Sequence, residues 1–228
     1  GQALVFQLNV LAGGAIIDTG FYNATITEGL LDGDELGGGL TKLGDGTLTL
    51  GGANTYTGAT LVEAGGLSVT GSLTSDVTVA DGAALLGTGT IVGDVVAGAG
   101  ATLAPGESIG TLTVTGNLAI GGTFDVEYDS DTQTIDLLNV SGTLDLSGAS
   151  LNFSDLGTGA LANGAYVFAN YGTLTGEPAP TVGLLPNMSV DYYYNAGSSI
   201  ALVVVPEPST LALLAGLFAL LAGYRTRR

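Results

Sequence analysis

The chain of 228 residues carries 21 acidic and 4 basic side chains, and it has no histidine, cysteine or tryptophan. Three of the basic residues are the final arginines, so residues 1–205 hold 20 acids against Lys42 alone, a net charge of −19. Such a charge repels nucleic acid and anionic lipid, and we expect no nucleic-acid partner. The missing imidazole and thiol groups exclude Ser-His-Asp and Cys-His catalytic sites, zinc sites with these ligands, and disulfides.

Residues 1–39 are less regular than the rest. Segments 4–10 and 22–26 alternate apolar and polar residues and predict short strands, while 32–39 reads as an acidic glycine-rich loop. Because an open end of a stack of strands exposes unpaired backbone, we expect 1–39 to form an N-terminal cap.

A Gly-x-apolar-x-apolar pattern recurs through the middle of the chain and predicts a stack of short strands. Apolar residues fall on one side of each strand and Thr, Ser or Asp on the other. Four of the five spacings between copies are near 20 residues, the lower end of the range for solenoids. The copies begin at Gly46, Gly65, Gly89, Gly110, Gly122 and Gly142.

A single strand of this length cannot bury its apolar side, but stacked strands bury a continuous column. We therefore predict a parallel β-helix over 40–160, with roughly seven rungs at about 20 residues each. An antiparallel sandwich or barrel is the alternative. Residues 161–205 are expected to form a C-terminal cap, with strands at 165–169, 189–194 and 199–205.

Residues 206–228 have the pattern of a membrane-sorting tail. Pro206 and Pro208 end the preceding strand, and an uncharged apolar run follows at 211–223. The run is short of the roughly 20 residues that span a bilayer. Its apolar character on all sides nevertheless favours a transmembrane helix over a buried amphipathic one. The arginines after it indicate a cytoplasmic end, which places the bulk of the chain on the exported side.

This tail resembles the PEP-CTERM sorting signal of exported Gram-negative bacterial proteins. The resemblance implies that Pro206, Glu207 and Pro208 are the element recognised by an exosortase, a membrane-embedded processing enzyme. It also implies that Arg225, Arg227 and Arg228 form a stop-transfer cluster, and that the protein is anchored in the inner membrane only transiently. Because export must come first, we expect that a signal peptide preceded Gly1.

A second resemblance covers the repeats. Residues 40–69, which read LTKLGDGTLTLGGANTYTGATLVEAGGLSV, are similar to the autotransporter-associated β-strand repeat. Residues 103–114 and 136–140 resemble the downstream part of autotransporter passenger domains. Both resemblances imply a right-handed parallel β-helix displayed outside the cell. The sorting tail stands where the family has its outer-membrane barrel, so we expect no self-transport through the outer membrane. The predicted fold class is thus all-β, a parallel β-helix followed by one C-terminal hydrophobic helix.

The search for catalytic or metal-binding residues leaves only carboxylates. Asp125, Glu127 and Asp129 alternate along one predicted strand and share a side, which favours a solvated acidic face over a catalytic pair. Asp129, Asp131 and Asp136 have oxygen spacing like that of a calcium loop but lack its glycine turn and final glutamate. We expect an acidic turn there, with Ca²⁺ as the alternative and no other cofactor.

These patterns predict an exported, non-catalytic structural or adhesive protein of the cell surface or extracellular matrix, in a biofilm, sheath or filament. Its expected partners are an exosortase, the inner membrane through the tail, extracellular polysaccharide, and further copies stacked end to end. One alternative is a β-helix that binds or cleaves polysaccharide with carboxylates. The other is a membrane-anchored surface spacer.

Overall fold

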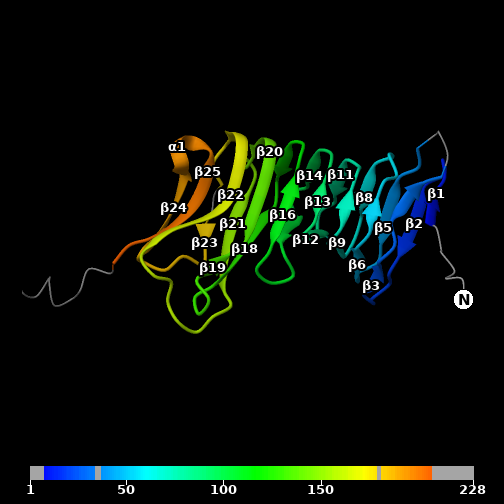
Figure 1. Cartoon of the computed structure of the whole chain (residues 1–228). Coiled ribbons are helices and arrows are strands. Elements are labelled where there is room, and N and C mark those ends of the chain that lie inside the picture. Colours follow the sequence, from blue (N-terminus) through cyan, green and yellow to red (C-terminus); the bar gives the residue numbers. More distant parts are fainter. Residues whose placement is uncertain (1–7, 34–36, 179–180, 207–228) are drawn as a thin grey trace, which may run out of the picture.

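The fold is known from a computed structural model that describes residues 8–33, 37–178 and 181–206. The molecule is elongated, with short strands stacked along its length from the N-terminal to the C-terminal end (Figure 1). The strands lie on three sides of a common interior, which we call face one, face two and face three.

Neighbouring strands within each face are parallel. Face one contains β2 (Ala15–Asp18), β5 (Leu40–Leu43), β8 (Thr60–Val62), β11 (Val77–Val79), β14 (Val95–Ala97) and β17 (Leu118–Ile120). Face two contains β7 (Ala53–Asn54), β10 (Ser72–Leu73), β13 (Thr90–Ile91) and β16 (Thr111–Val114). Face three contains β3 (Ala24–Ile26), β6 (Thr47–Leu50), β9 (Gly66–Val69), β12 (Ala84–Gly87), β15 (Thr102–Pro105), β18 (Thr123–Asp129), β21 (Ser150–Asp155) and β23 (Thr181–Val182).

The long strand β20 (Leu137–Asp145) joins two faces. Its first half pairs with β16 and its second half with β17, so it bends from face two to face one. At the other end, β1 (Leu8–Val10) pairs in parallel with β4 (Leu30–Asp32). The N–H of Thr55, just after β7, donates to the carbonyl oxygen of Leu30 at 2.9 Å, which makes β4 the neighbour of β7 on face two.

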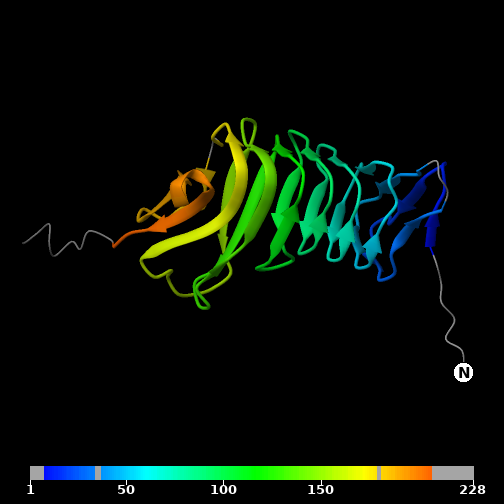
Figure 2. The ribbon, with the colours of Figure 1, turned by 45° about the horizontal axis from the view of Figure 1, so that its top comes forward.

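The chain visits the faces in a fixed order: one, three, two, and then one again. After β5, β6 and β7, for example, β8 pairs with β5 on face one, one step further along the molecule. The coil is seen from a second direction in Figure 2, and one short strand on it, β19 (Thr134–Ile135), pairs antiparallel with β18. This course is consistent with a parallel β-helix, while its right-handedness stays a prediction.

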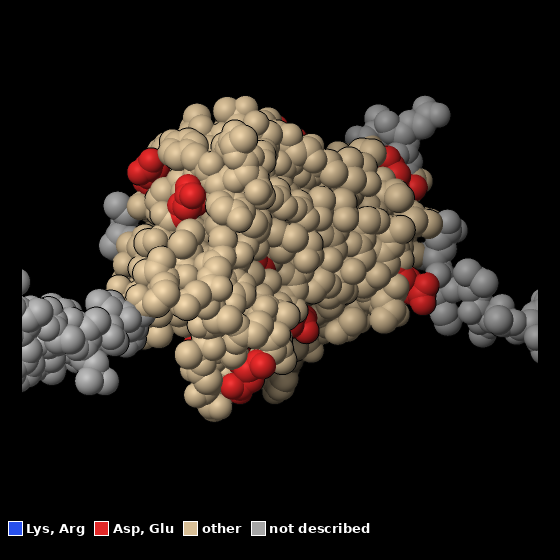
Figure 3. Space-filling model, turned by 60° about the vertical axis from the view of Figure 1, so that its left-hand side comes forward, with Lys and Arg blue, Asp and Glu red and all other residues tan. Residues whose placement is uncertain are grey.

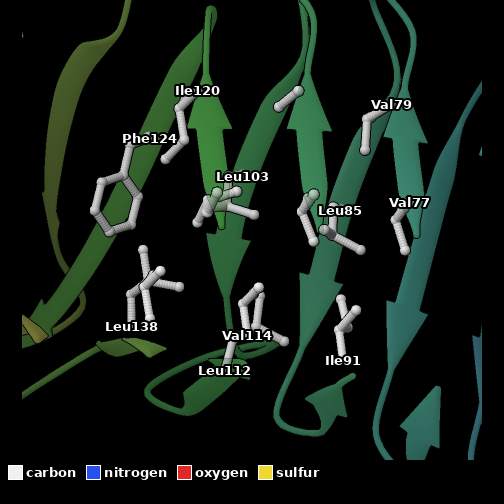
Figure 4. Close-up of a cluster of buried hydrophobic side chains, with 14 of the residues drawn as sticks. Val77, Val79, Leu85, Ile91, Leu103, Leu112, Val114, Ile120, Phe124 and Leu138 are labelled. Atoms are coloured by element: carbon white, nitrogen blue, oxygen red, sulfur yellow. The ribbon is translucent and has the colours of Figure 1, made fainter. Parts of the chain in front are cut away.

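Apolar and polar residues alternate along the strands, which places the apolar side chains in the interior. In β6, the two leucines point inward and the two threonines outward, and Leu48 and Leu50 have no exposed surface. Leu48 is aligned with Leu67, and Leu67 with Leu85, so one apolar column runs under face three. Side chains from all three faces meet along the axis (Figure 4). Each buried leucine contributes about 1.5–3 kcal/mol relative to an exposed one, so the column is the main stabilising feature.

The circuits of the coil are shortest in the middle of the molecule and longest at its C-terminal end. The backbone N–H of Asp94 donates to the carboxylate of Asp76, 18 residues earlier on the preceding circuit. The side-chain amide of Asn170 donates to that of Asn139, which lies 31 residues earlier. Aromatic rings fill the wider interior: the ring of Phe168 lies 6.0 Å from that of Phe124 and packs edge-on against another phenylalanine at 5.3 Å.

Antiparallel strands cover the C-terminal end. β22 (Gly164–Thr175) lies parallel to β20 on one side and antiparallel to β25 (Ser199–Val204) on the other, and β25 also pairs with β24 (Met188–Tyr193). The expected strand 165–169 lies within β22, and the expected strands 189–194 and 199–205 each extend one residue beyond β24 and β25. The helical segment α1 (Tyr194–Gly197) is a turn with left-handed residues, since φ is 54° at Asn195 and 59° at Ala196.

The predicted fold class needs one correction, because it combined the β-helix with a C-terminal hydrophobic helix. In the part of the chain that the structure describes, no helix is long and apolar enough to cross a membrane. The predicted helix, 211–223, lies outside the described residues. The physical reason against it is length, since an uncharged run of 13 residues falls short of the roughly 20 needed to span a bilayer. The described residues form an all-β fold.

The glycine-initiated repeats are also not equivalent to one another. The copy at Gly110 forms β16 on face two, whereas the copy at Gly122 forms β18 on face three. Their short separation of 12 residues is therefore the distance between two faces of one circuit, not an irregular circuit.

Candidate functional site: a groove on face three

The residues predicted for sorting are mostly beyond the described part. Pro206 follows β25 and is exposed to solvent. Glu207 and Pro208, and the basic cluster Arg225, Arg227 and Arg228, lie outside the described residues. Their roles stay predictions from the sequence.

The three aspartates considered for calcium have separate structural tasks. Asp129 accepts hydrogen bonds from the backbone N–H groups of Asp131 and Thr132, which hold the pKa of its carboxyl below the usual value. Asp131 accepts from the N–H of Thr158 in a neighbouring loop. Asp136 is buried. Among residues 8–33, 37–178 and 181–206, no three acidic side chains are grouped so as to hold a metal ion.

Asp136 ties two segments of the fold together. The N–H of Gly110 donates to its Oδ1 and the N–H of Glu127 donates to its Oδ2, both at 2.8 Å. Burial raises the pKa of the Asp136 carboxyl to about 6, with a further contribution from the charge of Glu127, although the two N–H groups act in the opposite direction. Gly110 ends the loop 106–110, and Glu127 belongs to β18, so this carboxyl fixes that loop relative to face three.

The loop 106–110 borders a groove on the outside of face three. Two adjoining clefts, of about 250 and 280 Å³, share Leu86 and Glu107 and together form this groove. Hydroxyl groups and an amide line one part, an apolar floor lies in the middle, and acids line the other part. The lining residues are Asn23, Thr47, Thr49, Ser68, Leu86, Thr102, Ala104, Pro105, Gly106, Glu107, Asp125, Glu127 and Ser154.

The groove forms where outward-facing side chains are small. Ser68 and Ala104 project from β9 and β15, the outward sides opposite to buried leucines. The loop then folds back over this face: Gly106, which has a left-handed φ of 93°, forms an antiparallel bridge with Gly87. The hydroxyl of Ser68 donates to Glu107 Oε1 at 3.0 Å, which fastens the loop to β9.

The lining residues of the groove include three acidic side chains and no basic one. Glu107 is exposed, and Asp125 and Glu127 are half-buried. Asp125 Oδ1 accepts a hydrogen bond from the side-chain amide of Asn152 on β21 at 2.8 Å, which orients that carboxylate. From the side shown in Figure 3, the visible acids form separate red patches, and no basic side chain is seen between them.

The one base among the described residues, Lys42, serves the fold. Its side chain has no exposed surface, and Nζ donates to the carbonyl oxygens of Leu43, Gly44 and Ala64 at 2.8 to 3.1 Å. Burial lowers the pKa of this amine, and the charges of Asp18 and Asp45 oppose that effect. The sequence analysis assigned Lys42 no role. Its burial could have been inferred from its position two residues after Leu40, because alternate residues of a strand lie on the same side.

The groove itself was not predicted, although Asp125 and Glu127 were placed together on an outward face, as the structure has them. Glu107 comes from a distant loop, and sequence periodicity gives no indication that this loop folds over β9 and β12. The proline and glycine before Glu107 do mark a turn, which is the signal available in the sequence.

Comparisons with known proteins find similarity over part of the chain. The family described as PATR, Passenger-associated-transport-repeat, matches residues 40–69, which run from β5 to β9. A stretch of 77 residues is 42% identical to the "Extracellular serine protease" of Serratia marcescens. That stretch is 34% of this chain and 7% of the length of that protein. The repeat resemblance at 40–69 is thereby confirmed.

Proposed function

We propose that this protein is an exported, non-catalytic β-helix that serves as structural or adhesive material at the cell surface or in the extracellular matrix. The observation that carries the proposal is the passenger-type repeat at 40–69, which lies inside one continuous coil of parallel strands. The partial relative is described as extracellular, which supports export of this chain as well. A continuous coil with one interior is suited to a stiff spacer or scaffold.

Composition supports a non-catalytic role. The 228 residues contain no histidine or cysteine, so the chain cannot build the Ser-His-Asp or Cys-His sites used by many hydrolases. Lys42, the one basic residue of 1–206, is buried, so its side chain is not available to a site on the surface.

The proposal includes sorting by an exosortase at Pro206, Glu207 and Pro208. Two observations support it: the sequence resemblance, and the exposed position of Pro206 just after the last strand of the cap. A recognition element in an exposed segment beyond a folded domain is accessible to a processing enzyme.

Protease treatment of intact native cells tests export. We expect peptides from 8–206 to be released from intact cells or found in the medium, with a cytoplasmic marker protein protected in the same sample. Protection of this protein until the cells are lysed would overturn export. Mass spectrometry of the mature C-terminus tests sorting separately: an end near Pro208 supports it, and an end at Arg228 contradicts it.

A further inference from the structure

We propose that the groove on face three binds a polysaccharide of amino sugars whose amino groups are free and positively charged. This ligand goes beyond the proposed function, because a surface scaffold need not bind any glycan. Three features of the groove point to it: an extended shape, hydroxyl-rich walls, and acidic groups in one part.

The shape fits a chain laid across the strands. The lining residues come from β6, β9, β12, β15, β18 and β21, six successive strands of face three. Strands in a sheet are about 4.8 Å apart, so the strands that supply the lining of the two clefts span roughly 24 Å, and Leu86 and Glu107 line both clefts. A polymer of several sugar units can lie along such a length, whereas a single small metabolite would occupy a fraction of it.

The walls offer both donors and acceptors for sugar hydroxyls. Thr47, Thr49 and Thr102 project outward from their strands and are half-buried, so their hydroxyls are within reach of a ligand in the groove. Leu86 and Ala104 supply a small apolar floor, which suits the apolar side of a sugar ring. In ligand sites, placed polar groups fix the orientation of the ligand and confer specificity.

The charge of the groove selects for amino sugars over acidic ones. Glu107, Asp125 and Glu127 line the same cleft of about 250 Å³, and the basic side chain of Lys42 is buried elsewhere. An acidic polysaccharide would be repelled, while ammonium groups spaced along a chain would meet these carboxylates.

A basic peptide is the competing cationic ligand, and the sheet disfavours it. Peptides commonly add to a sheet at a free edge, through backbone hydrogen bonds. The groove lies on the face of central strands whose backbone groups pair with neighbours on both sides, so it offers no such edge. Side-chain hydroxyls and carboxylates remain, and these match a polyhydroxylated amine better than a peptide backbone.

Calorimetric titration of the full chain with a β-1,4-linked glucosamine hexamer tests the proposal at mildly acidic pH, where the amines are charged. The N-acetylated hexamer and hexalysine serve as comparison ligands. We expect binding of the glucosamine hexamer that weakens as salt is raised. We expect Glu107→Gln and Asp125→Asn each to weaken it about tenfold. The matched control is Glu63→Gln, a charge change at an exposed residue outside the groove, and we expect it to have little effect.

A second variant tests the location independently of charge. Ala104→Trp fills the middle of the groove from the outside of β15, and we expect it to abolish binding while the circular dichroism spectrum and Tm stay as in the wild-type chain. If Ala104→Trp folds and binds normally, the site is not this groove. Absence of binding, equal binding of the N-acetylated hexamer, or equal binding of hexalysine would each overturn the choice of ligand. Cleavage of the hexamer would instead contradict the non-catalytic function and leave the site in place.

Discussion

Replacing Lys42 by methionine tests whether the buried lysine stabilises the coil. Methionine keeps the apolar stem of the side chain but removes the ammonium group. The carbonyl oxygens of Leu43, Gly44 and Ala64 then lose a charged donor that now lies 2.8 to 3.1 Å away. Gly44 and Ala64 are on adjacent circuits, so the variant also loses a link between them.

The expected cost follows from these three hydrogen bonds. Bonds to a charged donor contribute about 1.5–3 kcal/mol each but are not additive, and the variant no longer has to desolvate an ammonium group. We therefore expect the free energy of unfolding to fall by about 3 kcal/mol. For a chain of this size, that is a decrease in Tm of roughly 6–12 °C.

Urea unfolding followed by far-ultraviolet circular dichroism measures the effect. The matched control is Thr41→Met, the same new side chain on the same strand but on its outward, half-exposed side, with an expected change within about 0.5 kcal/mol. A Lys42→Met variant as stable as the wild-type chain would refute the assigned role. Equal losses in both variants would show that methionine, rather than the lost ammonium, is responsible.

Two further predictions concern the carboxyl clamp and the cap. Because the pKa of Asp136 is raised to about 6 in the folded chain, the folded state binds more protons than the unfolded state between about pH 4 and 6. The free energy of unfolding of the wild-type chain, relative to that of Asp136→Asn, should therefore fall as pH rises through this window and then level off. Urea unfolding at several pH values measures this difference. A rise of the difference with pH would contradict the prediction. Ala196→Gly should raise Tm by roughly 2–4 °C in calorimetry, because it relieves a left-handed alanine that costs about 1 kcal/mol. A lower Tm would mean that the turn is not strained.

Alternation in the sequence was enough to predict the strands and their inward sides. The pattern Thr-Leu-Thr-Leu at 47–50 specifies which side is buried, and the structure has both leucines fully buried. The near-20 spacing between copies was also close to the length of the circuits between Leu40 and Val95, which are 17 to 20 residues long. Local pattern sufficed there because each strand is short and every circuit repeats the same burial.

The number of faces could not be predicted from the alternation of apolar and polar residues. Strands at Gly110 and Gly122 look alike in sequence but lie on different faces, because a corner depends on backbone conformation rather than on apolar spacing. The role of Asp136 was missed for a related reason. Its partners Gly110 and Glu127 are 26 and 9 residues away, and only the folded coil brings them to one carboxyl.

Disulfide trapping between register partners tests the central claim, a coil of parallel strands, most directly. The chain has no native cysteine, and Thr78 on β11 is aligned with Val96 on β14, both exposed on face one. Neighbouring strands are about 4.8 Å apart, which is within the usual Cα separation of a disulfide. Ala119 lies on β17, where it is aligned with Val96, so it is two strands away from Thr78 and too far for a disulfide. After mild oxidation and mass spectrometry, the coil predicts an intramolecular disulfide in Thr78→Cys/Val96→Cys and free thiols in Thr78→Cys/Ala119→Cys. Free thiols in the first pair, or a disulfide in the second, would contradict it.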